Sequence, residues 1–146
     1  LMSSISEKQN HIVDEFKKFD SWEAKYKYII DLGKHLVEMA PKHKTDMNKV
    51  KGCQSQVWLH AELLPDFKIH FSADSDALIV KGLIALLMKV YDLEKPTEIL
   101  KNPPKFINEI DLGTHLSPSR ANGLNAMIKQ ITNYAIAFEM LAKSKA

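Results

Sequence analysis

The only cysteine of this 146-residue chain, Cys53, lies in the stretch KVKGCQSQVWLH (residues 49–60). A thiol reacts as its thiolate, and with an ordinary pKa of about 8.5 only a few per cent is ionised at neutral pH. One cysteine excludes an internal disulfide and a multi-cysteine zinc or iron–sulfur site built by this chain alone. Cys53 is therefore either an inert structural thiol or a reactive one.

The neighbours of Cys53 bear on this choice. Gly52 permits unusual backbone angles and leaves the sulfur accessible. The N-terminus of the helix expected in DSDALIV (residues 74–80) and the guanidinium of Arg120 would each raise the thiolate fraction if they lay close. Asp74 and Asp76 would act in the opposite direction, and the sequence pattern does not say which of these groups reaches the sulfur.

Other polar residues have a structural and a functional interpretation. Gln54, Ser55 and Gln56 either satisfy backbone groups of their loop or hydrogen-bond a group carried by the sulfur or a partner. The segment 74–76 reads first as a set of helix caps.

A metal site can also be drawn from the histidines. His60 and His70 fall on one face of the expected hairpin and would form a zinc site with Cys53 or His115. Their spacing matches no standard zinc motif, so no metal site is predicted.

The elements that must position Cys53 follow from hydrophobic periodicity. Helical spacing predicts a first helix around residues 5–19 and a second one that starts at Asp20 as N-cap. Period-two runs at residues 57–63 and 67–71 predict an antiparallel hairpin, and a third short strand is expected around residues 48–51. Cys53 then lies on the connection between the first two strands.

Helices follow the sheet. Residues 76–91 are apolar on nearly every side and predict a buried central helix, in which Gly82 would let another backbone come close. Short helices follow, and Ser117 as N-cap with Pro118 at the first helical position opens the last helix. The fold class is therefore predicted to be α+β, with a small three-stranded antiparallel meander packed against helices.

Composition narrows the class of protein. A single domain over residues 1–146 is expected, with residues 1–4 disordered or derived from an expression vector. Hydrophobic content of 45% and charged content of 26% are ordinary for a soluble globular protein, and a net charge of +2 argues against nucleic acid or an anionic membrane as partner. The chain shows neither an apolar run long enough for a membrane span nor the apolar core of a signal peptide, so a cytoplasmic location is expected.

Four blocks of the sequence resemble the SufE family of sulfur-acceptor proteins, which serve cysteine desulfurases in iron–sulfur cluster assembly. They are KYKYIIDLGK (residues 25–34), VKGCQSQVWL (50–59), DSDALIVKGLIALL (74–87) and LGTHLSPSRANGLNAMI (112–128), in the family's order and at similar spacing. The hairpin turn LLPDF and the outer helices differ from the family's pattern but carry no motif.

The resemblance implies a SufE/IscU-like fold and a role for Cys53 as the sulfur acceptor. A pyridoxal-phosphate desulfurase of the SufS or CsdA type would hand its persulfide sulfur to Cys53, and an iron–sulfur scaffold complex would receive it; the cofactor belongs to the desulfurase, and none is expected in this chain. The residues that the resemblance implies for partner binding or loop restraint are Gly52, Gln54, Ser55, Asp76, His115 and Arg120. A single thiol is suited to this role, because a second one nearby would attack the persulfide and release sulfide.

Other functions stay open beside this one. A cluster or zinc scaffold of the related IscU-like fold would need several ligands, typically three cysteines. An independent thiol enzyme would need a base such as His60, His70 or His115 to activate Cys53, and no hydrolase signature surrounds it. A plain adaptor would need no reactive cysteine. The resemblance favours a sulfur-transfer accessory protein over a stand-alone enzyme.

Overall fold

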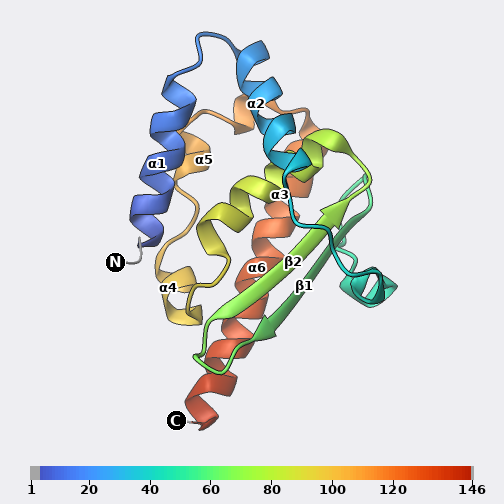
Figure 1. Cartoon of the computed structure of the whole chain (residues 1–146), viewed down its shortest axis with the longest axis vertical. Coiled ribbons are helices and arrows are strands. Elements are labelled where there is room, and N and C mark those ends of the chain that lie inside the picture. The colour runs from blue at the N-terminus through green and yellow to red at the C-terminus, as the bar shows by residue number, and fades with distance from the viewer. Residues whose placement is uncertain (1–3, 146) are drawn as a thin grey trace.

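The computed structural model describes residues 4–145 and consists of a β-hairpin, the central helix α3 and further helices around them (Figure 1). Helices α1 and α5 lie together on one side of α3, the long C-terminal helix α6 runs behind the hairpin, and the short helix α4 packs against α6. Within residues 4–145, no helix combines the length and the apolar character needed to cross a bilayer. The helices and strands are α1 (Ile5–Lys17), α2 (Trp22–Lys34), β1 (Val57–Leu63), β2 (Ile69–Ser75), α3 (Leu78–Tyr91), α4 (Pro96–Lys101), α5 (Phe106–Glu109) and α6 (Pro118–Lys145).

The sheet has two antiparallel strands among the described residues, and the expectation of a third strand is wrong. Strand β1 pairs with β2 from Val57 opposite Ser75 to the end of the hairpin. The segment expected to form the third strand makes one isolated bridge, between Lys49 and Trp58. Its ladder stops there because the chain turns away at Gly52, which has a φ of 91°. The α+β class itself is confirmed.

Two helix starts lie later than expected. The N-cap of α2 is Ser21 and not Asp20, because the Ser21 hydroxyl accepts the Ala24 N–H at 3.2 Å. The strand β2 runs on to Ser75, so α3 begins at Leu78 after the N-cap Ala77. Residues 74–76 are therefore strand end and connection, and no side chain caps α3.

The core centres on α3, whose side chains are buried on nearly all sides as the sequence predicts. Its closest neighbour is α2. A Cβ atom built on Gly82 would lie only 2.2 Å from the Ile29 carbonyl oxygen, and one built on Gly33 only 2.7 Å from the Gly82 nitrogen. The prediction that Gly82 admits another backbone is confirmed.

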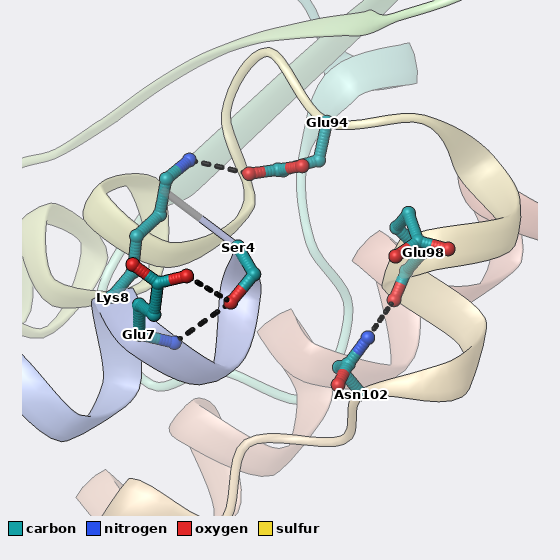
Figure 2. Close-up of polar contacts among 6 residues, drawn as sticks. All are labelled: Ser4, Glu7, Lys8, Glu94, Glu98 and Asn102. Atoms are coloured by element: carbon teal, nitrogen blue, oxygen red, sulfur yellow. Dashed lines mark hydrogen bonds and ion pairs between the residues drawn. The ribbon is translucent and has the colours of Figure 1, made fainter. Parts of the chain in front are cut away.

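Polar contacts fix α1 against the rest of the chain (Figure 2). The Lys8 ammonium forms an ion pair with the buried Glu94 carboxylate, with 2.5 Å between Nζ and Oε2. Ser4 is the N-cap of α1, and its hydroxyl accepts the Glu7 N–H at 3.1 Å. Of the four residues expected to be disordered or vector-derived, 1–3 lie outside the described residues.

Candidate functional site

Cys53 lies on a short loop between Val50 and the first residue of β1. Three hydrogen bonds close this loop, one of them from the Asp76 N–H to the Gln56 carbonyl at 3.3 Å. The Val50 N–H donates to the Val57 carbonyl at 2.8 Å, and the Gln56 N–H donates to Oδ1 of Asp76 at 3.0 Å. The loop is thus tied to the sheet at one end and to the β2–α3 connection at the other, while the residues between these ties are free of the ladder.

The sulfur of Cys53 rests against the long helix α6. The half-buried thiol donates to the Gly123 carbonyl, with 3.7 Å between Sγ and O. A Cβ atom built on Gly123 would lie 3.6 Å from the same sulfur. Burial raises the pKa of the Cys53 thiol above its ordinary value, because a thiolate loses hydration there. At rest, therefore, Cys53 is a protonated thiol.

A cavity of about 330 Å³ opens beside Cys53. The cysteine loop, α3 and the N-terminal part of α6 each form a part of its wall. The buried apolar residues of the lining form its floor, and the exposed polar residues form its rim. Its lining residues are Cys53, Gln54, Ser55, Val57, Val80, Leu83, Ser117, Ser119, Arg120, Gly123 and Met127. Four of the expected site residues line this cavity: the consecutive residues Cys53, Gln54 and Ser55, and Arg120, which lies far from them in the sequence.

The rim contributed by α6 follows from its first turn. As expected, the Ser117 hydroxyl accepts the Arg120 N–H, at 3.3 Å, and Pro118 is the first helical residue. The start of α6 places Ser119 and the exposed Arg120 along the cavity. Within the described residues no ion pair engages the Arg120 guanidinium, so it is available to a group outside this chain.

Gly52 and Asp76 shape the loop without lining the cavity. The φ of 91° at Gly52 is a conformation that residues with a side chain rarely adopt, and it turns the chain towards Cys53. Asp76 is exposed, and its carboxylate holds the loop through the Gln56 N–H.

The structure places His115 away from the sulfur. Its ring stacks on Trp22, with 3.9 Å between ring centroids, and its Nε2 lies 3.6 Å from a carboxylate oxygen of Asp111. His115 lies in the 3₁₀ turn Gly113–His115 before α6 and is not among the residues that line the cavity.

The two hairpin histidines also have local partners. His60 stacks on His43 at 3.7 Å between ring centroids, and Nδ1 of His70 lies 3.1 Å from Oδ1 of Asp92. Burial lowers the pKa of His60, and the neighbouring His43 adds to this. Among residues 4–145, no group of three His, Cys, Asp or Glu side chains is arranged to hold a metal ion.

Asp74 does not act as the helix cap that the sequence suggests. It is buried, its Oδ2 lies 2.6 Å from the Lys44 ammonium and its Oδ1 lies 3.4 Å from that of Lys81. Burial alone would raise the pKa of Asp74, but hydrogen bonds from Lys44 and the Ser75 N–H, with the nearby lysine charges, lower it below its ordinary value. The carboxylate therefore fastens the segment before the cysteine loop to β2 and α3.

Gly123 and Met127 were also missed as site residues. A glycine inside a helix costs about 1 kcal/mol relative to alanine, and this signal, used for Gly82, applies equally to Gly123. The sequence does not show that Cys53, 70 residues earlier, is the group that this glycine faces.

Comparisons with known proteins agree with this arrangement. A family model described as SufE, an Fe-S metabolism associated domain, matches residues 10–135. An uncharacterized SufE-like protein of Rhizobium meliloti is 40% identical over 130 residues, which cover 86% of this chain and 93% of the relative. One from Rhizobium etli is 42% identical over 130 residues, which cover 86% of this chain and 88% of the relative.

A solved structure gives the same fold. The solution structure of a hypothetical protein from Thermus thermophilus superposes with a TM-score of 0.76, at 21% identity, over 91% of this chain and 96% of that one. The domain match covers most of the chain, and the two relatives match along nearly their whole length. The chain therefore belongs to the SufE family, whose domain is associated with iron–sulfur metabolism.

Proposed function

We propose that the protein accepts sulfur on Cys53 from a cysteine desulfurase and passes it to an iron–sulfur cluster scaffold. One observation carries the proposal. The chain's single thiol is half-buried on a short loop and borders a cavity of about 330 Å³ at the start of α6. Such a thiol can be exposed to a partner and then covered again with its cargo.

The transfer is an exchange between sulfur atoms. The Cys53 thiolate attacks the outer sulfur of the persulfide on the desulfurase, and a new sulfur–sulfur bond forms on Cys53. The bond between the two sulfurs of the donor breaks, and the donor cysteine leaves as a thiolate with the electron pair. The pyridoxal phosphate that first released the sulfur from cysteine belongs to the desulfurase. Removal of the product persulfide should raise the turnover of that enzyme.

The resting state of Cys53 favours control by the partner. A protonated, half-buried thiol is a weak nucleophile, so transfer requires that the loop leave α6 and the sulfur become hydrated. The thiol itself is held at α6 by one hydrogen bond, to the Gly123 carbonyl, while the bonds to Val57 and Asp76 hold the two ends of the loop. Contact with the desulfurase at the cavity rim, where Arg120 is exposed, is the event that we expect to open it.

The rival functions find less support at this site. A base for a thiol hydrolase would have to approach Cys53, but His60 is stacked on His43 and His115 on Trp22. An adaptor with an incidental cysteine would not need a cavity beside the sulfur.

The proposal is tested by loading the protein in solution. The protein is mixed with a pyridoxal-phosphate cysteine desulfurase and cysteine, and its intact mass is measured with and without a reductant. We expect a reducible gain of one sulfur atom in the wild type, complete loss of this gain in Cys53→Ser, and faster desulfurase turnover with the wild type only. Serine is close to cysteine in shape but cannot form a persulfide.

Other results point elsewhere. Bound iron or zinc without a gain of sulfur indicates a metal scaffold. A wild type that gains no sulfur and leaves the desulfurase rate unchanged contradicts the proposal and leaves a thiol enzyme or an adaptor.

A further inference from the structure

We infer that Gly123 of α6 is a positioning residue for the sulfur on Cys53. Its carbonyl accepts the hydrogen bond of the Cys53 thiol before sulfur is transferred. Because Gly123 has no side chain, it also leaves space for the outer sulfur of a Cys53 persulfide. The inference rests on the proposed sulfur transfer. It starts from two distances at one residue, the 3.7 Å between Sγ and the Gly123 carbonyl oxygen and the 3.6 Å that would separate Sγ from a Cβ atom.

The hydrogen bond of the thiol cannot survive loading. In the resting state the Cys53 thiol donates to the Gly123 carbonyl, with 3.7 Å between Sγ and O, so its hydrogen lies on the side of that oxygen. A sulfur–sulfur bond is about 2.05 Å long, so an outer sulfur in the direction of that hydrogen would lie roughly 1.7 Å from the oxygen, far inside contact distance. The outer sulfur must therefore turn away from the carbonyl, and the S–H···O bond is lost.

The space to which it turns lies along residue 123 and the apolar floor of the cavity. Gly123 is itself buried, and the cavity continues from it to Met127, Val80 and Leu83. Because Gly123 has no Cβ, the directions from Sγ that face this residue are open to a second sulfur. A methyl group there would still fit against the resting thiol, because 3.6 Å is an ordinary van der Waals separation. It would block those directions for a persulfide.

Gly123→Ala therefore separates the unloaded from the loaded protein. Alanine favours the helix, so we expect a melting temperature equal to or above that of the wild type. The rate at which iodoacetamide alkylates the unloaded thiol should stay within twofold of the wild type. After loading by a desulfurase, cyanide should remove the outer sulfur at least fivefold faster, because the loaded loop can no longer close. In this reaction cyanide attacks the outer sulfur, Cys53 leaves as a thiolate and thiocyanate is measured.

The control variant is Asn122→Ala, an exposed position one residue earlier on the same helix. It should match the wild type in both reactions. A merely structural role of Gly123 would change alkylation and cyanide sensitivity together. Equal cyanide rates in Gly123→Ala and the wild type overturn the inference, and so does a melting temperature well below that of the wild type, because it would contradict the space measured at residue 123.

A second experiment modifies Cys53 chemically, without a desulfurase, and so tests the inference separately from the proposed function. Methyl methanethiosulfonate forms a methyl disulfide on Cys53, because the thiolate attacks the sulfenyl sulfur and methanesulfinate leaves. Dithiothreitol should reduce this disulfide at least fivefold faster in Gly123→Ala than in the wild type. If a desulfurase fails to load the wild type, the proposed function fails while this arm still tests the room beside residue 123; equal reduction rates reject the inference alone.

Discussion

Two glycines on neighbouring helices have opposite surroundings. A Cβ atom on Gly82 of α3 would lie 2.2 Å from the backbone of α2, whereas one on Gly123 of α6 would lie 3.6 Å from the nearest atom, the sulfur of Cys53. At the first position glycine is needed because another main chain already occupies the space. At the second it leaves space beside the sulfur of Cys53. The contact between α2 and α3 is thus tightly packed, whereas the contact between α6 and the cysteine loop adjoins a cavity with space for an additional atom.

The largest effect on stability should come from closing the tight contact. We expect Gly82→Ala to lower the free energy of unfolding by about 3 kcal/mol, because α2 and α3 must separate to admit the methyl group. Urea denaturation measures this change. Gly113→Ala is the matched control, since nothing lies within 4 Å of its Cβ position, and should change stability by less than about 0.5 kcal/mol. Equal stability of the two variants would remove the contrast between the two glycines.

A second prediction concerns the tie that closes the cysteine loop. Asp76→Ala removes the acceptor of the Gln56 N–H, which should loosen the loop and expose the thiol. One hydrogen bond contributes about 1 kcal/mol, so alkylation of Cys53 should be about fivefold faster. The midpoint of its pH profile should fall towards the ordinary thiol pKa, because the raised value comes from burial.

The conservative variant sharpens this test. Asp76→Asn keeps an oxygen that can accept the same N–H and should react within twofold of the wild type. If Asp76→Ala also reacts like the wild type, the bond to Gln56 does not hold the loop closed.

The smallest effect should appear in the pH dependence of stability at Asp74. Because its pKa is lower in the folded protein, the unfolded chain binds the proton first as the pH falls. The stabilisation is complete above the unfolded value of about 3.9 and is lost as the pH falls through the lower folded value. Between pH 5 and pH 2 the wild type should therefore lose more stability than Asp74→Asn, by about 0.5–1 kcal/mol after allowance for the partly exposed Lys44. Parallel acid unfolding curves would contradict this.

The sequence predicted what depends on local periodicity. The strand at residues 57–63, the buried helix after the hairpin and the close approach at Gly82 were all predicted correctly. Each leaves a signal in its own segment, either a hydrophobic period or a glycine inside a helix. The prediction of a third strand failed because one residue, Gly52, turns the chain before a ladder of hydrogen bonds with β1 can form. The prediction of helix caps at residues 74–76 failed because Asp and Ser are typical of caps, whereas pairing with β1 holds Asp74 and Ser75 in β2 and Asp76 lies in the connection to α3.

The site was predictable in part. Cys53, Gln54, Ser55 and Arg120 were expected together and line one cavity, while His115 stacks on Trp22 instead. The contact between Gly123 and Cys53 could not be predicted from the sequence, because it depends on where a loop 70 residues earlier in the chain meets α6. Such contacts are set by tertiary packing, which no local pattern encodes.

The protonated state of the resting thiol has a consequence for damage in the cell. Thiolates attack peroxides and small disulfides, and a half-buried thiol whose burial raises its pKa is a weak nucleophile toward both. A chain with a single cysteine has no second thiol to replace it if that residue is oxidised beyond the sulfenic acid. A thiol that stays protonated while its loop is closed would therefore also be protected from oxidation.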